Sequence, residues 1–144
     1  MAQPGKHFSE GSGTPTSSTA SPRIPDQHQL DFEIAFFSGI LDYSPDYVDV
    51  LRILGSLLTL KGRYAEGLKL DRRLVRLRPD DALAHYNLAC SYALLKRPEQ
   101  SLATLRRAVE LGYRDFRFMR EDRDLEIIRD DPRFRQLLRE YEIS

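Results

Sequence analysis

Apolar residues recur every three or four positions along most of the chain. The first such segment contains Leu30, Ile34, Phe37 and Leu41, and the next contains Leu51, Leu54, Leu57 and Leu58. This spacing places apolar side chains on one face of an α-helix. No stretch of the sequence alternates apolar and polar residues for long enough to indicate a β-strand. The pattern therefore predicts an all-α domain.

Turn signals separate the helical segments at regular places. They are Ser44-Pro45-Asp46, Lys61-Gly62-Arg63, Arg78-Pro79-Asp80-Asp81 and Leu111-Gly112. Proline cannot continue a helix, glycine tolerates the backbone conformation that ends one, and aspartate caps the next. A further helix is predicted to start at Pro132, because Asp131 is a favoured cap and proline suits the first helical position.

The sequence also repeats itself with a period of 34 residues. At this offset Leu54 aligns with Leu88, and one period earlier Pro45 aligns with Pro79. Periods of roughly 20–50 residues indicate stacked helical units, each too small to bury its own apolar face. The units we expect are a half repeat at 30–47, repeats at 48–81 and 82–115, and a degenerate cap at 116–144.

The two full repeats resemble those of the tetratricopeptide repeat family. In the first, Leu51 takes the position of the family's Trp and Leu54-Gly55 that of its Leu-Gly, and Pro79 closes the unit. In the second, Ser101 and Ala108 occupy columns where small side chains let helices approach closely. Positions that depart from the family's preferences are Asp71, Leu74 and Tyr113. The resemblance implies a short right-handed solenoid of antiparallel helix pairs, ending in a C-terminal capping helix.

Residues 1–28 have a different composition. Residues 1–27 hold four of the eight prolines and eight Ser or Thr residues, and their only large apolar side chains are Met1, Phe8 and Ile24. Such a segment buries too little surface to offset its ordering entropy, so we predict that it is disordered. It also lacks the basic start and apolar stretch of a signal peptide. The helical domain is predicted to span residues 29–144.

Composition and net charge restrict the classes of function that we expect for this protein. Lys plus Arg and Asp plus Glu both number 22, so the net charge is zero, which disfavours a generally basic nucleic-acid binder. No apolar run approaches the roughly 18–20 residues that span a membrane. Cys90 is the single cysteine, so no internal disulfide can form, and we expect a cytoplasmic protein. The arginines at positions 72, 73, 76, 78, 106 and 107 are interpreted as a solvated, salt-bridged face.

The sequence shows no arrangement typical of an enzyme, a metal centre or a cofactor site. His85 and Cys90 lie five residues apart, hence about 140° apart around a helix, which is poor geometry for a shared ligand. We interpret His85 as a structural side chain and Asp80-Asp81 and Asp130-Asp131 as caps. Asp122 and Asp124 are expected in a solvated turn.

The resemblance implies a protein–protein interaction module that binds a peptide segment in a concave groove lined by the first helix of each unit. The site residues it implies are Arg52, Ser56, Thr59, Tyr86, Asn87, Cys90, Arg117 and Arg120. Arg52, Asn87 and Arg117 match in type the residues with which some members grip a terminal carboxylate. Glu121 stands where that grip needs a positive charge, so the full clamp is not expected.

Self-association is the alternative function. The half repeat has more aromatic side chains than a short capping helix needs, namely Phe32, Phe36, Tyr43 and Tyr47. It also lacks its first helix. An exposed apolar edge of this kind marks a partner surface. The alternative is therefore a homo-oligomeric assembly protein, a homodimer that associates through residues 30–47.

Overall fold

The computed structural model describes residues 26–142. Its elements are α1 (Gln27–Tyr43), α2 (Val48–Lys61), α3 (Tyr64–Leu77), α4 (Ala82–Leu94), α5 (Pro98–Glu110), α6 (Phe116–Glu121), the 3-10 helix η1 (Arg123–Ile128) and α7 (Pro132–Glu142). This range contains no β-strand, which confirms the predicted all-α class. The segment predicted to be disordered lies, up to residue 25, outside the described residues.

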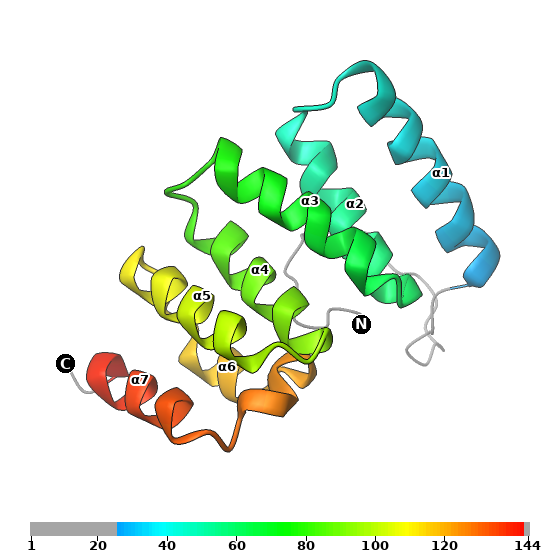
Figure 1. The fold of residues 1–144 in the computed structure, drawn as a ribbon. Helices are drawn as coiled ribbons and strands as arrows, with labels where there is room; N and C mark the ends of the chain where they lie inside the picture. Colours follow the sequence, from blue (N-terminus) through cyan, green and yellow to red (C-terminus); the bar gives the residue numbers. More distant parts are fainter. Residues whose placement is uncertain (1–25, 143–144) are drawn as a thin grey trace, which may run out of the picture.

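The helices follow one another across the molecule, with α1 at one end and α7 at the other (Figure 1). In this view α2 lies behind α3, and α6 lies behind α5 and α7. From α1 to α5, helices that are neighbours in the sequence pack against one another, whereas η1 packs on α4 and α7 packs on α5.

Helix starts keep the period of the sequence repeat. The helices α2, α4 and α6 begin at residues 48, 82 and 116, each 34 residues after the one before. The helices α3, α5 and α7 begin at residues 64, 98 and 132, with the same spacing. Together α6 and η1 cover the stretch that α4 covers one period earlier. The segment expected as a degenerate cap thus has the helix spacing of the repeats before it, with its first helix interrupted at Asp122.

The helix ends agree with the predicted turn signals. Gly62 ends α2 with φ of 88°, and Gly112 follows α5 with φ of 119°, both in the left-handed region that glycine tolerates. The backbone N–H of Arg133 donates to Asp131 Oδ1 at 2.9 Å, so the predicted cap at α7 is confirmed. Asp26 accepts from the backbone N–H of His28, and α1 consequently begins at Gln27, ahead of Leu30.

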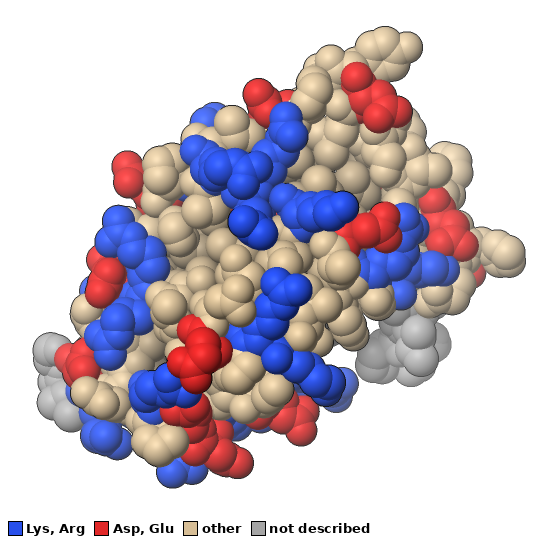
Figure 2. Space-filling model, in the orientation of Figure 1, with Lys and Arg blue, Asp and Glu red and all other residues tan. Residues whose placement is uncertain are grey.

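Charged side chains cover the layer that contains α3, α5 and α7. Figure 2 shows blue groups over α3, with red groups interspersed toward α7. Arg73 pairs with Asp46 at 2.6 Å and Arg106 with Glu140 at 2.9 Å, as the salt-bridged interpretation predicts. Exposed pairs of this kind contribute little to stability, typically about 0.2–1 kcal/mol each.

Buried apolar side chains form two separate clusters among the described residues. The larger joins α4, α5, α6, η1 and α7 and includes Leu105, Met119 and Ile128, all without exposed surface. The smaller joins α1 to α2 through Leu30, Ile34, Leu54, Leu57 and Leu58. Since stabilisation rises with buried apolar area, the two ends of the array differ in local stability.

Hydrogen exchange is therefore expected to be uneven. Amides of α1 should exchange at least about tenfold faster than those of α4 and α5, because the smaller cluster opens at lower free energy. Mass spectrometry of the exchanging native protein measures this directly. Equal protection of α1 and α5 would show that the two clusters unfold as one unit.

Candidate peptide-binding face

The eight predicted site residues lie on the first helices of three successive units. The helix α2 carries Arg52, Ser56 and Thr59, α4 carries Tyr86, Asn87 and Cys90, and α6 carries Arg117 and Arg120. We call the surface that these helices share the first-helix face. Most of its predicted site residues are buried, whereas Arg117 and Arg120 are exposed and lie near Glu121 and Glu142.

Tyr86 belongs to a buried network. Its hydroxyl donates to Asp122 Oδ2 at 2.6 Å, and its ring stacks on that of Tyr113 with 4.2 Å between centroids. Burial, together with the nearby Cys90 and Asp122, raises the pKa of Tyr86 well above its ordinary value. Tyr86 therefore stays protonated and acts as a donor that positions η1 against α4.

Asp122 and Asp124 are not in a solvated turn, so that prediction was wrong. Both are buried, and Asp122 Oδ1 accepts from the backbone N–H of Asp124 at 2.9 Å and thereby caps η1. Arg129 donates to the backbone carbonyl of Asp122. The carboxylate holds the short helix in place because it satisfies donors from two elements.

The sequence does contain a signal for this network: a charged residue stands at a position where the other repeats have an apolar one. One and two periods before Asp122 the sequence has Leu88 and Leu54, both buried. Asp71 shows the same signal, since one period later its column holds the buried Leu105. Its Oδ2 accepts from the hydroxyl of Ser91 at 2.5 Å. An acid in such a column implies a buried hydrogen-bond donor nearby.

His85 and Cys90 have structural surroundings. The Nε2 of buried His85 lies 2.9 Å from the carbonyl oxygen of Pro79, so the interpretation of His85 as a structural residue is confirmed. Cys90 is buried, with its Sγ 3.8 Å from Asp122 Oδ2. Between residues 26 and 142, no three His, Cys, Asp or Glu side chains are grouped so as to hold a metal ion.

Arg52 links the first two full units. Its Nη2 lies 2.7 Å from Oδ2 of Asp81, whose Oδ1 caps α4 by accepting from the backbone N–H of Ala84. Burial alone would raise the pKa of Asp81, but hydrogen bonds from Arg52 and Ala84 outweigh it and hold that pKa below its ordinary value. The guanidinium is therefore fixed at the junction of α2 and α4.

Three polar atoms on this face are buried without a hydrogen-bond partner. They are Arg52 Nη1, Ser56 Oγ and Asn87 Oδ1. Ser56 is 4% exposed and Asn87 2% exposed, so solvent does not satisfy them. Thr59, by contrast, donates to the backbone carbonyl of Gly55 at 3.0 Å. An unsatisfied buried polar atom costs about 1–3 kcal/mol, so a ligand group that reached these three atoms would recover that cost.

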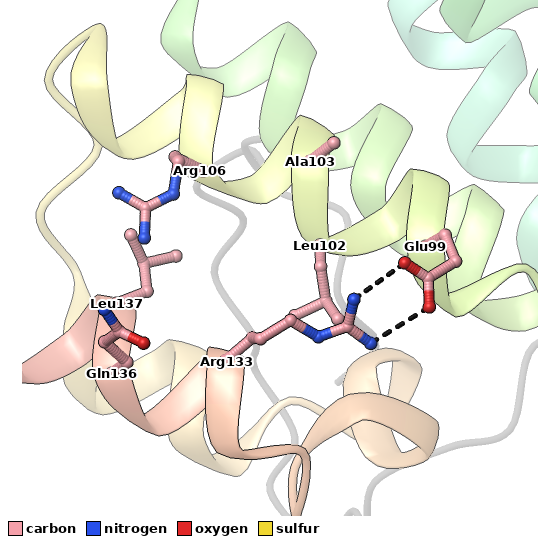
Figure 3. Close-up of a pocket in the computed structure, with 7 residues that line it drawn as sticks. All are labelled: Glu99, Leu102, Ala103, Arg106, Arg133, Gln136 and Leu137. Atoms are coloured by element: carbon pink, nitrogen blue, oxygen red, sulfur yellow. Dashed lines mark hydrogen bonds and ion pairs between the residues drawn. The ribbon is translucent and has the colours of Figure 1, made fainter.

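A hollow of about 330 Å³ lies in the other layer, between α5 and α7 (Figure 3). Arg133 crosses its mouth, with Nη1 2.7 Å from Oε1 of Glu99. Arg106, on the opposite wall, pairs with Glu140. Both guanidinium groups that line this hollow are thus already paired with carboxylates, and the pair of Arg133 and Glu99 joins α7 to the start of α5.

No family model matches the chain. Among curated proteins it is similar to a chloroplastic protein from Arabidopsis thaliana, with 32% identity over 93 residues. The similarity covers 62% of this chain and 28% of that protein, so the chain spans little more than a quarter of its relative's length. None of the helices within residues 26–142 is long and apolar enough to cross a membrane.

Proposed function

We propose that the chain is a short tetratricopeptide-type repeat protein that binds a peptide segment of a partner on its first-helix face, without catalysis. The constant spacing of the helix starts supports the repeat assignment. The three unsatisfied polar atoms of Arg52, Ser56 and Asn87 carry the functional part. We also propose the cytoplasm as its location, since the sequence has a single cysteine, Cys90, and therefore no internal disulfide, which suits a reducing compartment.

The chemistry of these atoms matches a peptide backbone. Asn87 Oδ1 accepts a hydrogen bond from a main-chain N–H, and Arg52 Nη1 donates to a main-chain carbonyl or an acidic side chain. Ser56 Oγ both donates and accepts. Arg117, exposed on α6, adds a positive charge at the next unit. Recognition thus rests on main-chain hydrogen bonds, while a few side chains determine most of the affinity.

Ser56→Ala separates a binding role from a structural one. Its hydroxyl has no partner to lose, and alanine favours a helix, so the free energy of unfolding should stay unchanged or rise by up to about 1 kcal/mol. Affinity for a bound peptide should fall about three- to tenfold. The peptide is one selected from a displayed random library on the wild-type protein, and its binding is measured by fluorescence anisotropy.

Ser101→Ala is the matched control. Ser101 is equally buried but donates to the carbonyl of Ala89 at 2.8 Å, so its loss should cost about 1 kcal/mol of stability and leave the affinity unchanged. Peptide binding that survives both Ser56→Ala and the double variant Arg52→Ala, Asn87→Ala would place the peptide elsewhere and refute the proposal.

A further inference from the structure

The outward face of α3 carries basic side chains without acidic partners. Lys69, Arg72 and Arg76 are exposed and follow one another at intervals of three and four residues, which places them on one side of the helix. Within residues 26–142 none of the three forms an ion pair. We call these three residues the α3 stripe. Figure 2 shows a group of blue side chains over this helix.

The two acids of α3 do not balance the stripe. Glu66 accepts a hydrogen bond from Nη2 of Arg63 at 2.8 Å, so its charge is already matched. Asp71 is buried and accepts from the hydroxyl of Ser91 at 2.5 Å. The stripe therefore presents positive charge that a negatively charged ligand could match.

The corresponding arginines of α5 are already paired. One period after Arg72 the chain has Arg106, which pairs with Glu140 at 2.9 Å. Beside it, Arg107 pairs with Glu110 at 3.4 Å. The salt-bridged interpretation of the arginines thus holds on α5, whereas the α3 stripe is exposed without such partners. The free positive charge belongs to α3.

On its other side α3 is bordered by α1, a helix without Lys or Arg. The exposed side chains there are aromatic. Phe32, Phe36, Tyr43 and Tyr47 are all exposed, so the exposure predicted for this row is confirmed, while self-association through residues 30–47 stays a prediction. Bordered in this way by α1 and by the paired arginines of α5, the stripe is about one helix wide and suits a single extended chain.

An apolar hollow of about 300 Å³ adjoins the stripe between α1 and α3, and Lys69 is one of its lining residues. Leucine side chains provide its apolar lining, namely Leu41, Leu54, Leu58 and Leu70. Asp42 and the paired Arg63 and Glu66 also line it. Since an acidic ligand group in the hollow would meet Asp42, the hollow favours an apolar side chain, the kind of anchor that fills pockets at protein interfaces.

The dimensions of the stripe match a short run of acidic residues. Lys69 and Arg76 are seven residues apart, hence about 10 Å along the helix axis. An extended peptide advances about 3.3 Å per residue, so three or four of its residues cover this length. A nucleic acid could match the charge, but it has no aliphatic side chain to fill the leucine-lined hollow.

We propose that the α3 stripe and the hollow beside it bind an acidic peptide segment of a partner protein, in which one apolar residue adjoins a run of Asp or Glu. The apolar side chain enters the hollow, and the carboxylates pair with Lys69, Arg72 and Arg76. This surface shares none of the site residues predicted for the first-helix face. Because the ion pairs are exposed, salt should weaken the binding.

Selection from a displayed peptide library on the full chain provides the probe. In this library one apolar position adjoins about four positions restricted to Asp, Glu, Ser and Gly, which span the stripe. The selected peptides should be enriched in Asp and Glu. Fluorescence anisotropy of one labelled peptide should show at least about threefold weaker binding when NaCl rises from about 0.05 M to about 0.5 M. Exchange of its apolar residue for serine should also weaken binding.

The double variant Arg72→Gln, Arg76→Gln should raise the dissociation constant of this peptide at least about tenfold. The matched control is Arg106→Gln, Arg107→Gln, which removes the same charge from α5 and should change the constant less than about twofold, because these arginines already have partners. Circular dichroism verifies that each variant keeps its helicity. The double variant Arg52→Ala, Asn87→Ala should leave the binding unchanged, and a peptide bound on the first-helix face should not compete.

Four results would overturn the proposal. The first is a selection without enrichment of acidic residues, and the second is an equal loss in the α3 and α5 variants, which would show a general effect of net charge. The third is a loss only in Arg52→Ala, Asn87→Ala, which would place the acidic peptide on the first-helix face. The fourth is tighter binding of a single-stranded oligonucleotide or a phosphatidylserine vesicle with the same dependence on Arg72 and Arg76.

Discussion

Asp122→Ala is expected to lower the free energy of unfolding by about 2–4 kcal/mol. The substitution removes the acceptor of the Tyr86 hydroxyl and of the Asp124 backbone N–H, both of which are buried. It also releases the side-chain cap of η1, while the backbone carbonyl of residue 122 still accepts from Arg129 and from the backbone N–H of Leu125. Urea unfolding followed by circular dichroism measures the change.

Two comparisons locate the cause of this loss. Tyr86→Phe removes one hydroxyl and should cost about 1–1.5 kcal/mol. Asp130→Ala, at a side chain that is 93% exposed and paired with Arg135, should stay within about 0.5 kcal/mol of the wild type. If Asp122→Ala unfolds at the same urea concentration as Asp130→Ala, the buried carboxylate does not hold the interrupted helix.

Gly55→Ala is expected to destabilise the protein by about 1–3 kcal/mol. In a helix this exchange ordinarily stabilises by about 1 kcal/mol, because glycine loses more backbone entropy. At Gly55, however, an added Cβ would lie 2.9 Å from Oδ1 of Asp71. Asp71 cannot easily retreat, since it is buried and its other oxygen is bonded to Ser91 at 2.5 Å.

Gly39→Ala is the internal control for this sign reversal. Gly39 also lies in a helix, but nothing occupies the space within 4 Å of its added Cβ, so the substitution should stabilise by about 0.5–1 kcal/mol. Thermal unfolding of both variants under identical conditions compares them. If Gly55→Ala also stabilises the protein, the side chain of Asp71 moves away from the added Cβ at little cost in free energy.

The sequence predicts the helices and turns well because their causes are local. Gly62, Asp131 and Pro132 act within one helical turn, through backbone conformation and capping, and the structure has helix ends at each. The period of 34 residues predicts the starts of α2 and α4, because each unit must bury the same apolar columns against its neighbours. Local and repetitive signals therefore determine the order of the helices.

The buried polar contacts could not be predicted in the same way. From the sequence alone, Asp122 is assigned to a loop. Only the structure shows that Tyr86, 36 residues earlier in the sequence, donates a hydrogen bond to it. The interruption between α6 and η1 lies at that same residue, whose side chain also caps η1. Likewise, the sequence selects Ser56 and Asn87 as groove residues, but only packing shows that their polar atoms lack partners.

Site-specific photo-crosslinking tests the central claim most directly. A photoreactive phenylalanine analogue replaces Asp49 on α2 or Arg117 on α6, two exposed positions on first helices. The matched controls carry it at Arg76 on α3 or Arg107 on α5, equally exposed in the other layer. The library-selected peptide should crosslink at the first two positions, and the double variant Arg52→Ala, Asn87→Ala should abolish this. Crosslinking at Arg76 or Arg107 instead would contradict peptide binding on the first-helix face.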